Sequence, residues 1–310
     1  MKRIDVWADM VCTWAHVGRQ RLVSAGFGED VEVVWRPYQL DPTAPGPQAE
    51  APRDPAVPTG EAPKGPIWGA VPQPNTFDAH RVIAVAYERG GSALQGAVVE
   101  RILRAHFTDG SDIGDRAVLA DLAAEAGLDG VAEALAAGEG TEQVRYQLLR
   151  GKAIGIGTSP TFVVGDQAVA GAQSPEVLRD LVRHAAPGRD LPEEVTRLRH
   201  AESLLDARDP LGALEMLRPL LEDHGDDPAV GLLAARAYFG SAQLGRALRT
   251  LEPLVERAPG DHYARFLLGR TLERSNRPDE ALPHLRLAAA MSSDPAYADA
   301  VRRVERRGAA

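Results

Sequence analysis

The sequence predicts two domains, an α/β domain interrupted by an all-helical insertion and, after it, an all-helical array of repeats. Three observations support this class. The length of 310 residues suits about two domains. Strand and helix patterns mix along the first 186 residues, with a purely helical block between the strands. From residue 194 onward, apolar residues recur every 34 positions, a period typical of paired-helix repeats.

The start of the chain predicts two strands around one helix. Residues 2–8 place β-branched side chains at alternate positions and predict a strand. A helix is expected from near Cys12 to about Ser24, and residues 31–40 predict a second strand. Proline cannot donate a hydrogen bond within a sheet, so Pro37 indicates an edge or the end of that strand.

Residues 41–74 predict a long irregular loop. They hold ten prolines, a density that forbids a helix or a central strand. Loops of this length are uncommon inside a domain and often form lids or binding loops. We expect this loop to lie across a cleft near Cys12, with Trp68 as its apolar anchor.

Helical periodicity returns over 78–153 and predicts the inserted helical block. Its helices are expected at about 78–89, 93–107, 115–126, 130–137 and 141–153. Residues 161–164 and 167–170 then predict a hairpin, because a Gly-Asp pair separates them. A last helix is expected over about 175–185. This order fits a mixed sheet whose two halves are separated by the insertion.

A linker at 187–193 is expected before the repeats, because it is rich in proline and glycine. Positions 34 residues apart then carry matching side chains: Ala213, Ala247 and Ala281, and Leu217, Leu251 and Leu285. This helix–turn–helix period is the signature of tetratricopeptide repeats. Repeats are predicted at about 194–227, 228–261 and 262–295. A capping helix completes the predicted domain at 194–310.

Arg236 and Arg270 occupy equivalent positions on the expected inner face of two successive repeats. Paired hydrogen bonds from two such arginines could hold the carboxylate at the end of a partner's chain. The alternative is that they form ordinary intramolecular ion pairs. The array is therefore expected to bind a partner protein, a second copy of the chain or the α/β domain, and the sequence leaves these three open.

Composition excludes several classes of function. The net charge of −9 argues against nucleic acid as a partner. No run approaches the ~18 apolar residues of a membrane helix, and the start of the chain does not resemble a secretory signal, so a cytoplasmic location is expected. The single cysteine excludes an intrachain disulfide and a multi-cysteine zinc site. The eight histidines show no metal-binding spacing, so no metal is expected.

Cys12 is the strongest candidate for a catalytic residue. It lies between a predicted strand and a predicted helix, where unpaired backbone N–H groups and the positive end of the helix dipole favour a thiolate. The thiolate is the nucleophilic form of cysteine. The alternative is a buried, inert cysteine that serves only packing.

Six separate motifs, in order, resemble the FrnE-like branch of the DsbA-like thioredoxin-fold family. The segment Asp9–Ala15, DMVCTWA, is similar to that branch's D-x-V-C-P-W-C. The other similar segments are 35–42 (WRPYQLDP), 75–81 (NTFDAHR), 107–113 (FTDGSDI), 159–162 (SPTF) and 171–176 (GAQSPE). The resemblance covers about residues 1–186. It implies an α/β thioredoxin fold with an inserted helical subdomain, followed here by an all-α tetratricopeptide solenoid.

The resemblance also implies thiol–disulfide exchange, with Cys12 as the nucleophile. Pro160 matches a proline whose preceding peptide bond is cis and which faces the active-site sulfur. Trp14 is expected to form a docking surface beside the sulfur. Asn75 and His80 join Trp68 as candidate residues of the substrate cleft, and the alternative for His80 is a helix-start histidine with no ligand.

Three residues depart from the family pattern. Ala15 replaces the second cysteine, Thr13 replaces a proline, and Ser159 replaces the valine before Pro160. A dithiol oxidase needs the second thiol to expel substrate from the mixed disulfide. The chain cannot do this alone.

Three interpretations follow from the missing thiol. The first is a single-thiol oxidoreductase in which an external thiol, glutathione or mycothiol, acts as co-substrate and resolves the adduct. The second is an enzyme like the kappa-class glutathione transferases or the 2-hydroxychromene-2-carboxylate isomerases, which carry serine at the position of Cys12. The third is a catalytically decayed adaptor that works through its repeats.

Overall fold

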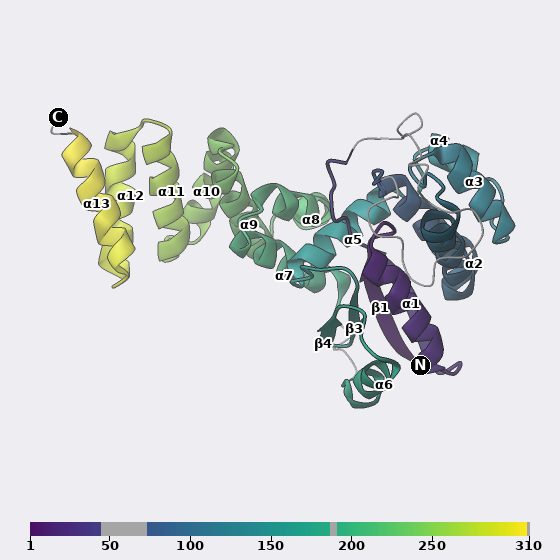
Figure 1. Cartoon of the computed structure of the whole chain (residues 1–310). Helices are drawn as coiled ribbons and strands as arrows, with labels where there is room; N and C mark the ends of the chain where they lie inside the picture. Colours follow the sequence, from purple (N-terminus) through teal and green to yellow (C-terminus); the bar gives the residue numbers. More distant parts are fainter. Residues whose placement is uncertain (45–72, 187–190, 309–310) are drawn as a thin grey trace. The chain divides into compact units, whose positions relative to one another are not determined.

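The computed structural model describes residues 1–44, 73–186 and 191–308, and it divides the chain into two compact units (Figure 1). Unit 1 spans Met1–Asp190 and unit 2 spans Leu191–Ala310. The predicted loop at 41–74, including Trp68, and the predicted linker at 187–193 lie largely outside the described residues. No helix in the described ranges is long and apolar enough to cross a membrane.

Unit 1 is built on a four-stranded mixed sheet in the order β2-β1-β3-β4. The strands are β1 (Lys2–Ala8), β2 (Val31–Pro37), β3 (Thr161–Val164) and β4 (Gln167–Ala170). Strands β1 and β2 are parallel, while β3 runs antiparallel to both β1 and β4. Strand β2 is an edge strand, as Pro37 predicted, and the strand ends there rather than at residue 40.

Helices α1 (Thr13–Ala25) and α6 (Pro175–His184) pack against each other, and the inserted block contacts β2. The block consists of α2 (Phe77–Arg104), the π-helix η1 (Ala105–Asp109), α3 (Arg116–Glu125), α4 (Val131–Ala136) and α5 (Thr141–Ala153). Figure 1 shows α2, α3 and α4 gathered on one side of unit 1. The hairpin and the inserted helical block are therefore confirmed.

The prediction of two helices at about 78–89 and 93–107 is confirmed. Both lie within α2, which consists of two helices joined at a kink where Gly90 and Gly91 leave helical geometry. Gly91 has φ 64° and ψ −162°, a region that residues with a Cβ atom avoid. The two glycines therefore end the first helix, and the chain resumes helical geometry directly after them.

We expect Gly91→Ala to lower the free energy of unfolding of unit 1 by about 1–3 kcal/mol, because alanine is strained at this φ and ψ. Gly96→Ala is the matched control in the same helix. A Cβ atom at Gly96 meets nothing within 4 Å, so alanine should be neutral or add up to about 1 kcal/mol. Denaturant titration followed by tryptophan fluorescence measures this in the full chain, since all four tryptophans belong to unit 1. Equal effects of the two substitutions would contradict it.

Unit 2 is a series of helices, each packed against the next along the chain (Figure 1). They are α7 (Glu193–Asp206), α8 (Pro210–Asp223), α9 (Pro228–Gly240), α10 (Leu244–Arg257), α11 (His262–Arg274), α12 (Pro278–Met291) and α13 (Pro295–Gly308). The repeated alanines and leucines from the 34-residue pattern are all completely buried. At Gly269 an added Cβ would lie 2.7 Å from Leu285, so the small residue at this repeat position permits close helix packing.

Candidate active site

The turn between β1 and α1 places Cys12 at the start of a helix. The Cys12 N–H donates to the Asp9 carbonyl at 3.1 Å, which closes the turn. The Cys12 carbonyl then accepts from the N–H groups of Ala15 at 2.9 Å and His16 at 3.2 Å, so Cys12 is the N-cap of α1. This confirms that the helix begins at Cys12. The cysteine is free and 5% exposed.

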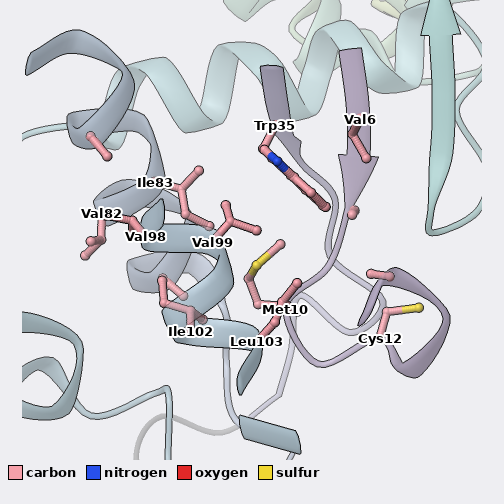
Figure 2. Close-up of a cluster of buried hydrophobic side chains, with 14 of the residues drawn as sticks. Val6, Met10, Cys12, Trp35, Val82, Ile83, Val98, Val99, Ile102 and Leu103 are labelled. Atoms are coloured by element: carbon pink, nitrogen blue, oxygen red, sulfur yellow. The ribbon is translucent and has the colours of Figure 1, made fainter. Parts of the chain in front are cut away.

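The sulfur of Cys12 faces the loop before β3. Its S–H donates to the Ser159 carbonyl at 3.3 Å, and the Ser159–Pro160 peptide bond is cis. The Ser159 hydroxyl oxygen accepts from the Asp9 N–H at 2.9 Å. Ser159 therefore holds both ends of the turn, one through its side chain and one through its carbonyl. Figure 2 shows the Cys12 side chain directed away from Ile102 and Leu103 in the apolar core.

Helix α1 and Pro160 approach each other closely at Gly18. A Cβ atom there would lie 3.1 Å from Pro160 Cγ and 3.2 Å from Phe162 Cζ. Contacts this short require the proline ring or the phenylalanine to move. The absence of a side chain at Gly18 thus allows Pro160 to sit against the helix that begins at Cys12.

The other residues of the predicted motif differ in their accessibility. Trp14 is 49% exposed, whereas Ala15 is completely buried. Thr13 is the first residue of α1. An exposed tryptophan two residues after a buried thiol suits the docking role expected for Trp14, and this role stays a prediction.

Two residues predicted for the cleft take part in intramolecular contacts. Asn75 Oδ1 accepts from the Phe77 N–H at 2.9 Å, while its amide donates to the Pro42 and Ala44 carbonyls at 3.3 Å. His80 is 3% exposed, and its Nε2 lies 2.9 Å from the Tyr38 carbonyl. The structure thus gives both residues a role in holding the segment after β2, and their place on a substrate cleft remains a prediction.

Asp9 is a site residue that the motif contained but that we did not predict as functional. Its carboxylate is buried, with Oδ2 accepting from the Leu40 N–H at 2.6 Å and Oδ1 lying 3.7 Å from His80 Nε2. Burial works to raise the pKa of Asp9, but His80, the Leu40 N–H and Thr76 outweigh it and lower the pKa below its ordinary value. Asp9 therefore stays ionised and links β1 to the start of α2.

Two further histidines flank the start of α1. His106 of η1 is completely buried, and its ring lies edge-on to Phe107 with centroids 4.6 Å apart. His16 of α1 lies 5.2 Å from the same ring. Burial lowers the pKa of His106 to about 4 and also lowers the pKa of His16. The spacing of the histidines gave no signal for this grouping, because the insertion brings the two segments together.

The depressed pKa of His106 predicts a loss of stability in mild acid. The unfolded chain takes up a proton near the ordinary value of about 6.5, while the folded chain resists until about pH 4. The free energy of unfolding should therefore fall by up to about 3 kcal/mol as the pH drops from 6.5 to 4. Protonation of His16 also lowers the free energy of unfolding as the pH falls, because its pKa is lowered too. Protonation of Asp9 lowers it only below the ordinary pKa of an aspartate.

Denaturant titrations between pH 7 and pH 4 measure this dependence. We expect His106→Leu to flatten it, whereas His184→Leu, at an exposed position on α6, should leave it as in the wild type. An unchanged pH dependence in His106→Leu would contradict the assignment.

A buried carboxylate fixes the strand that leads to the site. Asp5 of β1 lies 3.0 Å from Arg36 Nε, 3.2 Å from Arg150 Nη2 and 3.3 Å from Arg3 Nε. The Asp5 side chain is 7% exposed. These contacts connect β1, β2 and α5 behind the turn that carries Cys12. Among the described residues, no cluster of histidine, cysteine and carboxylate side chains could hold a metal ion.

The repeats bring the two predicted arginines to one surface. Arg236 and Arg270 line the same hollow on unit 2, which has a volume of about 400 Å³. Both also form intramolecular contacts, Arg236 with Glu202 and Asp206, and Arg270 with Glu273. Binding of a partner by Arg236 and Arg270 stays a prediction.

Comparison with known proteins agrees with the two-unit structure. Residues 3–183 match the model of the DSBA-like thioredoxin domain, and residues 204–267 match a tetratricopeptide repeat. The uncharacterized protein YwbO of Bacillus subtilis is 30% identical over 197 residues, which cover 58% of this chain and 94% of that protein.

Solved structures show weaker similarity. A probable DsbA oxidoreductase from Streptomyces coelicolor has 26% identity and a TM-score of 0.49, covering 62% of this chain and 94% of its own. The cytosolic disulfide reductase DsbM from Pseudomonas aeruginosa has 20% identity and a TM-score of 0.42, covering 59% of this chain and all of its own. The predicted fold class, a thioredoxin-like domain followed by repeats, is confirmed by the family matches and the observed elements. The thioredoxin-domain model matches more than half of the residues of this chain. The chain therefore belongs to the family of DSBA-like thioredoxin domains, here joined to a tetratricopeptide region.

Proposed function

We propose that the protein is a single-thiol thiol–disulfide oxidoreductase of the FrnE-like branch, in which Cys12 is the nucleophile and an external thiol resolves the adduct. The observation that carries the proposal is the placement of Cys12 as the N-cap of α1, with its sulfur on the Ser159 carbonyl beside Pro160. Unpaired N–H groups at a helix start stabilise a thiolate.

The reaction has two exchange steps. The Cys12 thiolate attacks one sulfur of a substrate disulfide, forming a mixed disulfide and releasing the other sulfur as a thiolate that takes up a proton. A thiolate of glutathione or mycothiol then attacks the substrate sulfur of the mixed disulfide. This forms a disulfide between substrate and small thiol and returns Cys12 as the thiolate.

Two features of the site set conditions on the first step. The sulfur must leave its hydrogen bond with the Ser159 carbonyl, because that carbonyl accepts from the protonated thiol and offers nothing to a thiolate. The substrate must also reach a cysteine that is 5% exposed. Trp14, two residues along the chain, is exposed and offers an apolar surface on which a substrate could dock.

The need for a small-thiol pool supports a cytoplasmic location, where such thiols are kept reduced. A steady-state assay tests the whole cycle: reduction of a small disulfide such as hydroxyethyl disulfide, with reduced glutathione or mycothiol as the second substrate. We expect turnover that depends on the small thiol and vanishes in Cys12→Ser. Turnover that is equal in Cys12→Ser would overturn the proposal.

The burial of Cys12 favours one alternative, a decayed site in a protein that acts as an adaptor. Resistance of Cys12 to alkylation in the folded protein is the expected result for the adaptor. Tight binding of glutathione without a covalent bond to Cys12 is the expected result for a transferase- or isomerase-like enzyme. Rapid alkylation together with a mixed disulfide is the result expected for the single-thiol enzyme.

A further inference from the structure

Strand β4 forms an open edge of the sheet in unit 1. It is the last strand in the order β2-β1-β3-β4, and no strand in the described ranges pairs with its outer side (Figure 1). Its residues, Gln167–Ala170, are exposed apart from Val169, which is partly buried against the core. An open edge offers a row of backbone N–H and C=O groups to another strand.

The register of the hairpin decides which backbone groups of β4 face outward. The two-residue turn before Gln167 makes this residue a hydrogen-bonded partner of β3, and residues on a strand alternate between bonding to one neighbour and to the other. The Gly171 N–H donates to the Pro160 carbonyl at 2.7 Å, which continues the same alternation beyond β4. The N–H and C=O groups of Ala168 and Ala170 therefore point away from β3.

The opposite edge of the sheet, β2, is protected from pairing. The Gln95 side chain accepts from the Trp35 N–H at 2.8 Å and donates to the Trp35 carbonyl at 3.1 Å. Strand β2 also contains a glutamate, an arginine and a final proline, and such residues discourage the pairing of edges. Strand β4 contains no charged residue and no proline. Its outward Ala170 carbonyl accepts from Gln173 Nε2 at 2.5 Å, and a carbonyl oxygen has a second lone pair for another donor.

We infer that β4 is the interface of a symmetric dimer, in which two copies of this chain pair their β4 strands in antiparallel orientation. A two-fold axis beside Val169 places Ala168 of each copy opposite Ala170 of the other. This register gives four backbone hydrogen bonds, because both residues direct their N–H and C=O groups outward. The two sheets then join into one, and both copies use the same surface, as two-fold symmetry requires.

Charge complementarity favours a second copy of this chain over an unrelated strand. In this register Asp166 of one copy lies opposite Ala172 of the other, and the Ala172 carbonyl accepts a hydrogen bond from the Arg21 guanidinium. Within the part of the chain that the structure describes, neither Asp166 nor Arg21 forms an ion pair. The dimer brings these opposite charges near each other twice, once at each end of the paired strands.

Sedimentation velocity of the full-length protein over a hundredfold range of concentration tests the inference. A reductant is present throughout, so that a disulfide between two Cys12 residues contributes no dimer and the result does not depend on the proposed function. Because strands of four residues form a small interface, the dimer should be transient. We expect the dimer fraction to rise with concentration, and hydrogen exchange of residues 167–172 to slow in parallel. A protein that stays monomeric over the whole range would overturn the inference.

Protein variants locate the interface. Asp166→Arg should weaken the dimer at least tenfold, because it places like charges together, and adding Arg21→Asp to it should restore affinity by exchanging the two charges. Glu29→Arg, with the same change of charge on the exposed turn before β2, should alter affinity less than twofold. Ala168→Pro removes an outward N–H but no hydrogen bond to β3, and it should also weaken the dimer at least tenfold.

Circular dichroism melting checks that each variant stays folded. Three outcomes would show that another surface or register is used and would overturn the inference. They are equal dimerisation of Asp166→Arg and Glu29→Arg, an unchanged dimer in Ala168→Pro, and no gain of affinity when Arg21→Asp is added to Asp166→Arg.

Discussion

Replacing Ala15 by cysteine is expected to convert the single-thiol site into a dithiol site that releases bound glutathione and turns over as an oxidase. Ala15 lies on the first turn of α1, where its N–H donates to the Cys12 carbonyl at 2.9 Å. Residues three apart on a helical turn face the same side, and their separation is compatible with the Cα distances of disulfides, roughly 4.4–6.8 Å. Ala15 is completely buried, so the new thiol would be shielded from external disulfides while Cys12 accepts the substrate.

The expected rate of glutathione release in Ala15→Cys follows from the short distance between positions 12 and 15. A thiol fixed beside the mixed disulfide attacks as an intramolecular group, and well-oriented groups gain several orders of magnitude over a dissolved reactant. We expect release of glutathione from Cys12 to accelerate by at least about a hundredfold in Ala15→Cys relative to the wild type with millimolar thiol. Stopped-flow release of glutathione followed by mass spectrometry measures it.

Ala15→Ser is the matched control, because it adds an atom of similar placement without a thiol. This variant should hold the adduct as the wild type does, and Cys12→Ser should form none. If Ala15→Cys keeps its glutathione as long as Ala15→Ser, the side chains at positions 12 and 15 do not meet, which would contradict the expected geometry.

Removing the buried carboxylate of Asp5 is expected to cost unit 1 about 3–5 kcal/mol of unfolding free energy. Asp5→Ala leaves Arg36 and Arg150 without their carboxylate, and their side chains are only 12% and 21% exposed. A largely buried guanidinium that loses its carboxylate keeps the cost of leaving water and loses the attraction that offset it.

Asp180→Ala provides the comparison. Asp180 pairs with Arg183 on the surface of α6, where both side chains are at least 60% exposed, and its loss should change stability by no more than about 0.5 kcal/mol. Denaturant titration with tryptophan fluorescence measures both variants. Similar effects of the two substitutions would show that the arginines find other partners or water.

Local signals in the sequence were strong enough to predict most of the framework. The strand before Cys12 and the helix after it followed from the change in hydrophobic period, and the Gly-Asp pair predicted the hairpin. The 34-residue spacing predicted the paired helices of unit 2 because each small residue permits one close helix contact. These features depend on neighbours in the chain or on a fixed period, which a single sequence displays directly.

Features that depend on distant segments could not be predicted in the same way. His106 is buried beside His16 because η1 folds over the start of α1, and neither periodicity nor motif spacing encodes that contact. Asp9 and His80 meet although they are 71 residues apart.

The central claim is that Cys12 forms a covalent adduct that this chain cannot resolve. Intact-mass spectrometry of the full-length protein after incubation with excess oxidised glutathione tests it most directly. We predict one glutathione per chain, located on Cys12, stable until a reduced thiol is added, and absent in Cys12→Ser. A wild-type protein that keeps its unmodified mass under these conditions, while folded, would contradict the single-thiol enzyme and leave the adaptor as the better account.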